Sequence, residues 1–192
     1  MKNKDIDVII ALMEIQVDNV SISQLSKILK INYKNTYNIV KRLEKENLIT
    51  LNKFGKAYNC ILNKQMHPLI FEAEFKRREE LLKNKNLKIL YNKLNSIIFP
   101  FIALIFGSYA KKDSNQYSDI DLMLIYNKNK DIGIERKISI LALDIHPITL
   151  NYEEFLKMAK NKEFNVVEEA MKNNIILIGI EDYYRLVDNV EP

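Results

Sequence analysis

The segment FGSYAKKDSNQYSDIDLMLIY, residues 106–126, constrains the fold more than any other part of this chain. Its second residue is Gly107, although the chain has only four glycines, and it ends in an apolar run that contains Asp119 and Asp121. The apolar run that leads into Gly107 predicts one buried strand, and DIDLMLIY predicts a second. Because side chains alternate across a strand, the two aspartates fall on the same face. The segment therefore predicts a strand, a turn, a short helix and a second strand that carries a pair of carboxylates.

The turn at Gly107 and Ser108 has the features of a phosphate-binding turn. A glycine lets a phosphate approach the backbone closely, because no Cβ stands in the way. The following residues, SYAKK, predict the first turn of a helix, whose backbone N–H groups point toward an anion together with the Ser108 hydroxyl. Lys111 lies near enough in sequence to add positive charge. We therefore expect Gly107, Ser108 and Lys111 to bind a phosphate group.

The pair Asp119 and Asp121 predicts a cation site beside this turn. Aspartate is depleted in strands, and two carboxylates on one strand face repel each other unless a cation lies between them. Hard divalent cations, Mg²⁺ above all, bridge carboxylates and nucleotide phosphates. Such ions activate an attacking oxygen and neutralise charge on a leaving pyrophosphate. The sequence thus predicts Mg²⁺ ions bound by Asp119 and Asp121.

A Gly-Ser pair, ten residues and then Asp-x-Asp in an apolar strand resembles the signature of the DNA polymerase β-like nucleotidyltransferases. In size and spacing it is most similar to the minimal nucleotidyltransferases (MNT) of that family. The resemblance covers residues 97–190 and implies that Gly107 and Ser108 hold a nucleoside triphosphate while Asp119 and Asp121 bind the metals. Family members often have Gly-Ser-x-Ala-Arg-Gly at the turn. Here Lys111 and Lys112 take the places of the arginine and the second glycine.

Full members of the family carry a third carboxylate on a neighbouring strand, and the sequence offers one candidate strand, LDIHPITL. Asp144 and His146 are two residues apart in this strand, so their side chains lie on the same face and either can face the site. We predict Asp144 as the third metal ligand. His146 is interpreted equally well as a structural or as a functional residue.

The remaining C-terminal segments predict a helix, a second helix, a strand and a closing helix. They are NYEEFLKMAKN, FNVVEEAMKN, IILIGI and EDYYRLV. Glu168 and Glu169 are interpreted as a solvated helix face. With the strands above, this order predicts an α/β domain with a mixed sheet.

The N-terminal half is basic. Residues 1–98 hold 18 Lys and Arg against 10 Asp and Glu, whereas residues 99–192 hold 11 against 15. Helical spacing of apolar residues over 5–16, after Ser23 and after Asn32 predicts three helices, with Ser23 and Asn32 as N-caps. The segments LITLN and AYNCIL, joined by a turn at KFGK, predict a hairpin.

Three short helices followed by a hairpin resemble a winged helix-turn-helix. The resemblance implies that residues 33–45 form a recognition helix, with base and phosphate contacts from its outer face and from the hairpin tip. The alternative is that this fold serves protein interaction or dimerisation. The DNA-binding candidates are Lys34, Asn35, Asn38, Lys41, Arg42, Lys53 and Lys56.

Residues 68–98 predict a long charged helix or a pair of helices, acting as a rigid connector or as a dimer contact. We therefore expect a DNA-binding domain at 1–65, a helical connector at 66–98 and a nucleotidyltransferase-like domain at 99–192. Overall this is an α+β protein.

Composition and sequence pattern indicate the expected cellular location of the protein. One cysteine, Cys60, excludes an intramolecular disulfide and fits a reducing cytoplasm. Cys60 stands among apolar neighbours and is interpreted as a small buried hydrophobic residue. The N-terminus lacks a signal-peptide pattern, and no apolar run reaches the length of a membrane span. We expect a soluble cytoplasmic protein.

These features together predict a Mg²⁺-dependent enzyme that moves a nucleoside monophosphate from an NTP, with ATP as the expected donor, to a hydroxyl group. Small proteins with this signature resemble the antitoxins of MNT/HEPN pairs, which implies a HEPN-type toxin as a protein partner and operon autoregulation through DNA. The alternative is a nucleotide-sensing DNA-binding regulator with a weak or inactive transferase domain. A homodimer is expected from the helix-turn-helix.

Overall fold

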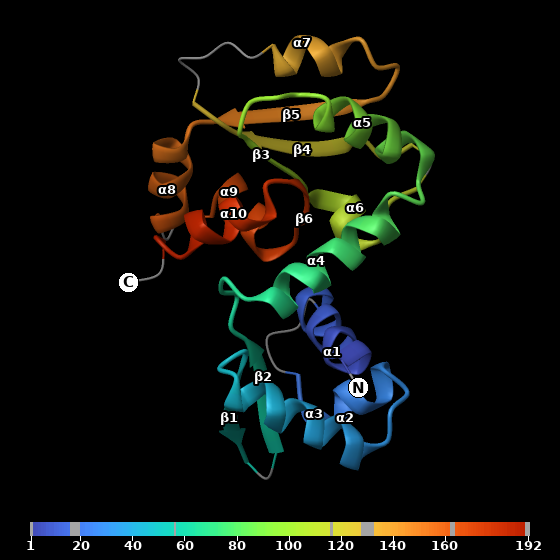
Figure 1. Cartoon of the computed structure of the whole chain (residues 1–192), viewed down its shortest axis with the longest axis vertical. Coiled ribbons are helices and arrows are strands. Elements are labelled where there is room, and N and C mark those ends of the chain that lie inside the picture. The colour runs from blue at the N-terminus through green and yellow to red at the C-terminus, as the bar shows by residue number, and fades with distance from the viewer. Residues whose placement is uncertain are drawn as a thin grey trace. The chain divides into compact units, whose positions relative to one another are not determined.

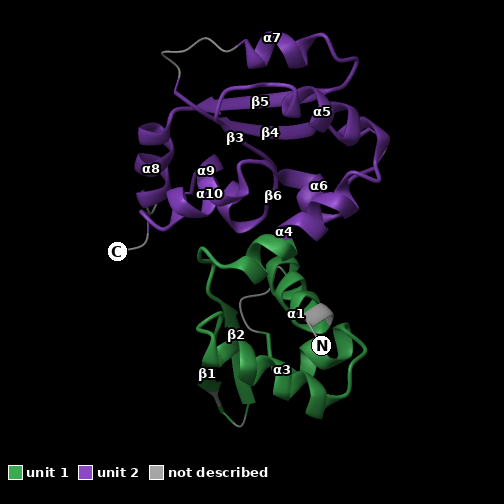
Figure 2. Cartoon of the chain, viewed as in Figure 1, with its two compact units in different colours: residues 1–73 green, residues 74–192 purple. Residues whose placement is uncertain are grey.

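The computed structural model describes residues 2–15, 20–55, 57–115, 117–127, 133–161 and 164–190. It divides into two compact units, residues 1–73 and residues 74–192 (Figure 2). Each unit contains its own sheet and its own buried residues. The second unit therefore begins well before the predicted start of the transferase domain at residue 99.

Unit 1 consists of three helices and a hairpin, in the order that the apolar spacing predicts. The two strands pair antiparallel, with Ile49 opposite Leu62 and Phe54 opposite Ala57. The described elements are α1 (Lys2–Glu14), α2 (Ile22–Ile28), α3 (Tyr33–Lys45), β1 (Ile49–Phe54) and β2 (Ala57–Leu62) (Figure 1).

The start of α2 differs from the prediction. Ser21, not Ser23, is the N-cap: its side chain accepts a hydrogen bond from the Gln24 backbone N–H, and the Gln24 side chain accepts one from the Ser21 backbone. The chain just before it is fixed by β2, because Val20 N–H donates to Asn59 Oδ1 at 2.7 Å. A serine with a glutamine three residues later forms a capping box, and this pairing places the helix start at Ser21.

The start and the inner face of α3 agree with the sequence. Asn32 caps the helix and accepts from Asn35 N–H at 2.8 Å. The apolar side of the helix is buried, as predicted, and consists of Thr36, Ile39, Val40 and Leu43.

The charged stretch after unit 1 forms two helices, α4 (Pro68–Leu81) and α5 (Lys85–Asn95), with Asn84 as the N-cap of α5. The boundary between the units falls within α4. The elements that follow are β3 (Ile102–Ile105), α6 (Gly107–Lys111), β4 (Ile120–Ile125), α7 (Ile134–Ser139), β5 (Ile145–Leu150), α8 (Tyr152–Lys160), α9 (Val166–Lys172), β6 (Ile175–Ile178) and α10 (Ile180–Val187).

Unit 2 is built on a four-stranded sheet with the order β5-β4-β3-β6. β3 pairs antiparallel with both β4 and β6, whereas β4 and β5 are parallel. The sheet is mixed, as predicted. The parallel pair sets the register that matters for function, because it places Asp121 opposite His146.

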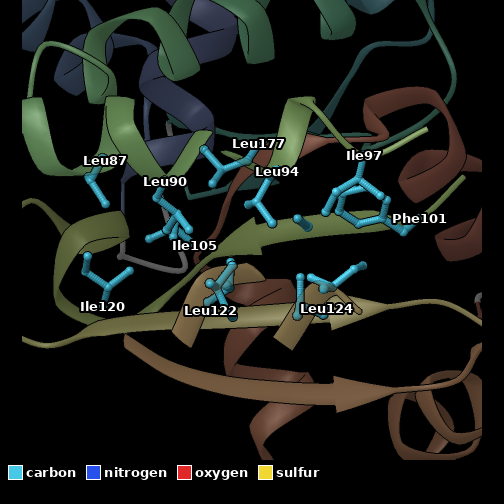
Figure 3. Packing of buried hydrophobic residues seen from close by; sticks show 13 residues of the cluster. Leu87, Leu90, Leu94, Ile97, Phe101, Ile105, Ile120, Leu122, Leu124 and Leu177 are labelled. Carbon is cyan, nitrogen blue, oxygen red and sulfur yellow. The ribbon is translucent and has the colours of Figure 1, made fainter. Parts of the chain in front are cut away.

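One face of this sheet packs against α5 and α7. Leu87, Leu90 and Leu94 of α5 lie over Leu122 and Leu124 of β4 in a cluster of buried side chains (Figure 3). Side chains of the intervening strand residues, such as Met123, are buried outside this cluster. Because β3 and β4 are buried on both faces, their sequences are nearly continuous apolar runs and do not alternate between apolar and polar residues.

A buried polar network ties α4 to the last strand and helix of unit 2. Glu74 and Arg77 are 2% and 5% exposed and form an ion pair at 2.8 Å. Arg77 Nη2 also donates to the Asn174 carbonyl at 2.6 Å, and Tyr184 Oη donates to Glu74 Oε1 at 2.8 Å. Buried charges persist only when they are paired and hydrogen-bonded. This network therefore makes the second half of α4 part of the unit 2 fold.

Cys60 is buried, as the sequence predicts, and burial raises the pKa of its thiol to about 11. Among the residues that the structure describes, no helix combines the length and the apolar character needed to cross a membrane.

Candidate functional site

The Gly-Ser turn joins β3 to α6 and lies directly beside β4. Phe106 N–H donates to the Asp121 carbonyl at 3.1 Å, which fixes the turn against the neighbouring strand. Gly107 has φ +63°, and a Cβ at this position would stand 1.9 Å from Asp121 Oδ2. No other residue type fits here without moving that carboxylate. The left-handed conformation favours glycine and the lack of space requires it, and the result is a carboxylate held against the backbone of the turn.

The two aspartates meet an imidazole from the neighbouring strand. Asp121 lies in β4 and Asp119 immediately precedes this strand, while His146 lies opposite Asp121 in β5. His146 Nδ1 is 2.8 Å from Asp119 Oδ2. One ligand atom from each of the three residues lies within 4.8 Å of the other two. Two carboxylate oxygens and one imidazole nitrogen thus converge at a spacing suited to a divalent cation.

The surroundings of Asp121 make the ionised form of its carboxyl less favourable. The pKa of the Asp121 carboxyl is raised, first by burial and then by the nearby Asp119, and Glu169 acts in the same direction. His146 and Lys111 oppose the shift. A bound cation would favour the ionised carboxylate, so the cost of gathering these charges is offset when the site is filled.

Ser108 provides an independent sign that the turn takes a ligand. Its Oγ is buried, and within the described part of the chain it has no hydrogen-bond partner. A buried hydroxyl without a partner costs free energy, about 1–3 kcal/mol in mutational data. A phosphate oxygen at the turn would supply the missing acceptor. The hydroxyl, the glycine and the donor set therefore fit both a phosphate group and a divalent cation.

Lys111, the cation of the turn, is held by a residue from another helix. Its Nζ lies 2.9 Å from Glu169 Oε1 of α9, and both side chains are about one-third exposed, at 30% and 33%. The hydrogen bond to Glu169 is the main cause of the raised pKa of Lys111. Lys111 is therefore charged and near the site, but its ammonium group is paired with a carboxylate.

The structure does not bring Asp144 to the aspartate pair. Its side chain is 77% exposed, and its nearest described partner is His146, whose Nε2 lies 3.6 Å from Asp144 Oδ1. The position opposite Asp121 belongs to His146, because Asp144 precedes β5 and only its carbonyl joins the ladder, accepting from Ile120 N–H at 2.8 Å. In the described structure, an imidazole rather than the Asp144 carboxylate lies beside the aspartate pair.

Glu169 is the residue that sequence reasoning missed. It was expected on a solvated helix face, and its neighbour Glu168 does pair with exposed Lys172 on the same helix. Glu169 instead contacts Lys111, which is 58 residues away in sequence. No local pattern signals such a contact.

The predicted DNA-binding residues of unit 1 fall into two groups. Lys34, Asn35, Asn38 and Lys53 are exposed. Lys41 pairs with Glu44 on the same helix, and Arg42 donates to Asp5 of α1 through Nε at 3.1 Å and through Nη2. Arg42 therefore holds α3 to α1 within unit 1. Lys56 lies outside the described residues.

Comparison with known proteins agrees with this site. The family described as polymerase beta, nucleotidyltransferase matches residues 84–182, just over half of the chain. The matched range contains the Gly-Ser turn, both aspartates, His146 and Glu169. No curated protein and no solved structure matched the chain.

Proposed function

Because the chain belongs to the polymerase β family of nucleotidyltransferases, we propose that unit 2 transfers a nucleoside monophosphate from an NTP to an acceptor hydroxyl. Asp119, Asp121 and Ser108 are the proposed catalytic residues. The observation that carries the proposal is the Asp121 carboxylate packed over Gly107, because it brings the proposed phosphate-binding turn and the proposed cation-binding strand to one place.

The proposed reaction is an in-line substitution at the α-phosphorus. The acceptor oxygen forms a bond to this phosphorus, the bridging bond to the β-phosphate breaks, pyrophosphate leaves, and the hydroxyl proton passes to solvent. When bound, divalent cations such as Mg²⁺ supply charge neutralisation for the phosphates and acidify the attacking hydroxyl. The protein residues contribute mainly by positioning the groups and by stabilising charge.

Each residue of the turn has a proposed part in binding the triphosphate. Gly107 leaves room for the Asp121 carboxylate beside the turn, and the buried Ser108 hydroxyl donates to a phosphate oxygen. Lys111 exchanges its contact with Glu169 for a contact with the phosphates. A lysine provides a point charge here rather than the two-pronged contact of an arginine.

Transfer of radiolabel tests this proposal. The purified full chain is incubated with α-³²P-labelled ATP and Mg²⁺, or Mn²⁺ in parallel, alone and with cell lysate. We expect label on a protein or RNA band with the wild type and none with Asp119→Ala/Asp121→Ala. Absence of label with the wild type, while a filter assay still detects bound ATP, would favour the alternative function, a nucleotide-sensing regulator.

For unit 1 we propose a winged helix-turn-helix that binds DNA. The supporting observation is the solvent-facing side of α3, where Lys34, Asn35 and Asn38 are exposed opposite the buried apolar face. Tyr33 and Tyr37 stack beside them with ring centroids 6.3 Å apart, and both rings are accessible. Amide and basic side chains on one helix face are the groups that read bases and phosphates. Binding to the promoter of its own operon, and modification of a HEPN-type toxin partner, are the biological roles that we propose on family analogy.

Salt-dependent binding tests the DNA proposal. The probe is a duplex from upstream of the gene, with a random duplex of equal length as baseline. Each lost phosphate contact is expected to reduce the slope of log K against log salt by roughly 0.9. Lys34→Ala/Lys53→Ala should therefore reduce the slope by about 1.8, whereas Lys88→Ala, an exposed lysine of α5, should leave it unchanged. An unchanged slope in the double variant would contradict the proposal.

A further inference from the structure

The cation site of unit 2 contains a nitrogen donor where a carboxylate was expected. We infer that His146 is a metal ligand and that the site therefore selects a first-row transition-metal ion, such as Mn²⁺, over Mg²⁺. The inference rests on the proposed function of the same site and concerns its metal preference.

Strand register places the imidazole among the aspartates. β4 and β5 run parallel with Asp121 opposite His146, so the two side chains project from adjacent strands at the same level. On the other side, His146 Nδ1 is 2.8 Å from Asp119 Oδ2. A cation that contacts both carboxylates within this 4.8 Å cluster therefore also lies within reach of the Nδ1 lone pair.

A carboxylate lies near the second ring nitrogen. His146 Nε2 faces Asp144 Oδ1 at 3.6 Å. Histidines that bind metals usually present the N–H of the other ring nitrogen to a carboxylate or a carbonyl, which orients the ring and makes the ligating nitrogen more basic. In the inferred site Asp144, which does not join the aspartate pair, takes this positioning role once its carboxylate closes from 3.6 Å to hydrogen-bond distance.

Donor chemistry then favours a transition metal. Mg²⁺ prefers six oxygen ligands and retains several waters. Imidazole nitrogen suits Fe²⁺, Ni²⁺, Cu²⁺ and Zn²⁺ best, and among first-row divalent ions the affinity for mixed nitrogen and oxygen sites is lowest for Mn²⁺ and rises toward Cu²⁺. In addition, two carboxylates with a neutral imidazole carry two negative charges, which balance one divalent cation. The protein ligands therefore hold one such ion, and any second ion depends on the nucleotide phosphates.

Electron paramagnetic resonance of Mn²⁺ tests this inference without measuring activity. The full chain is titrated with Mn²⁺ alone, Mg²⁺ is added as a competitor, and pulsed spectra are examined for ¹⁴N coupling to the bound ion. We expect about one bound Mn²⁺ with ¹⁴N coupling in the wild type. His146→Asp should lose the coupling and reduce the preference for Mn²⁺ over Mg²⁺ by at least roughly tenfold, because even changes outside the ligand set commonly cost about 10–100-fold in metal affinity.

Three matched variants separate the outcomes. His67→Asn changes the other histidine of the chain and should keep the coupling, whereas Asp144→Asn should weaken Mn²⁺ binding without abolishing the coupling. Bound Mn²⁺ without ¹⁴N coupling, an unchanged preference in His146→Asp, or no Mn²⁺ binding at all would overturn the inference. Asp119→Asn/Asp121→Asn should abolish binding. If this variant binds Mn²⁺ like the wild type, the metal assignment of the proposed function fails together with the inference.

Discussion

Helix α6 begins and ends with the same backbone conformation but with two very different residues. Gly107 at its start has φ +63°, and Lys112 just after its end has φ +61°. The Gly-Ser-x-Ala-Arg-Gly pattern that this turn resembles has glycine at both positions, yet this chain has only the first. The difference lies in the surroundings. At Gly107 a Cβ would collide with the Asp121 carboxylate, whereas the position of Lys112 accommodates a full side chain.

This comparison shows that the left-handed conformation alone does not require glycine. A residue with a Cβ adopts this conformation at a cost of about 1–2 kcal/mol, which a folded domain can absorb. The lack of space is the stricter requirement, because a Cβ at Gly107 would displace the Asp121 carboxylate. The first glycine is thus tied to the position of this carboxylate, whereas the second position accepts a residue with a side chain.

Gly107→Ala should have the largest effect. The added methyl group must displace Asp121, and a shift of about 1 Å in a catalytic group commonly costs on the order of 100-fold in rate. We expect a comparable loss of label transfer and weaker ATP binding in the filter assay. Lys112→Ala, at the other end of α6, is the matched control and should retain activity. Equal activity in both variants would show that Asp121 has no role at the turn.

Glu169→Gln should have an intermediate effect, and it should strengthen ATP binding rather than weaken it. The change releases Lys111 for the triphosphate and removes a negative charge that helps to raise the pKa of Asp121. Because partly exposed ion pairs are worth up to about 1 kcal/mol, ATP should bind about two- to fivefold more tightly by calorimetry. Glu168→Gln, which breaks the exposed pair with Lys172 on the same helix, should leave ATP affinity unchanged. Weaker binding in Glu169→Gln would instead assign the carboxylate a direct part in the site.

Lys112→Gly should have the smallest effect. Glycine removes the conformational cost of the left-handed backbone but adds freedom to the unfolded chain, so we expect a net stabilisation of about 0.5 kcal/mol. Urea unfolding of the full chain measures the change. A clear loss of stability would show that the lysine side chain makes contacts worth more than the backbone cost.

The sequence alone was sufficient to predict the structure wherever a local pattern determines it. The element order of both units follows from apolar spacing, and the Gly-Ser and Asp-x-Asp spacing located the turn and the carboxylates. The N-cap of α2 was missed by two residues because two serines compete there, and only Ser21 has a glutamine three residues later. That signal was present in the sequence.

Two features of the site needed the three-dimensional structure. Whether Asp144 or His146 lies beside the two aspartates depends on the register of two parallel strands, since the sequence pattern places both side chains on the same strand face. The contact between Lys111 and Glu169 joins two helices that are distant in sequence. Neither register nor long-range docking leaves a periodic pattern in the amino-acid order.

The buried network at Glu74 has a consequence for how the transferase unit can be isolated. The family match begins at residue 84, but Glu74 and Arg77 bind Tyr184 and the carbonyl of Asn174. A fragment cut at the family boundary would lose the buried hydrogen bonds that Glu74 and Arg77 make to Tyr184 and to the Asn174 carbonyl. Expression trials should therefore start no later than Pro68, where α4 begins. The buried polar network of unit 2 thus reaches further toward the N-terminus than the family match does.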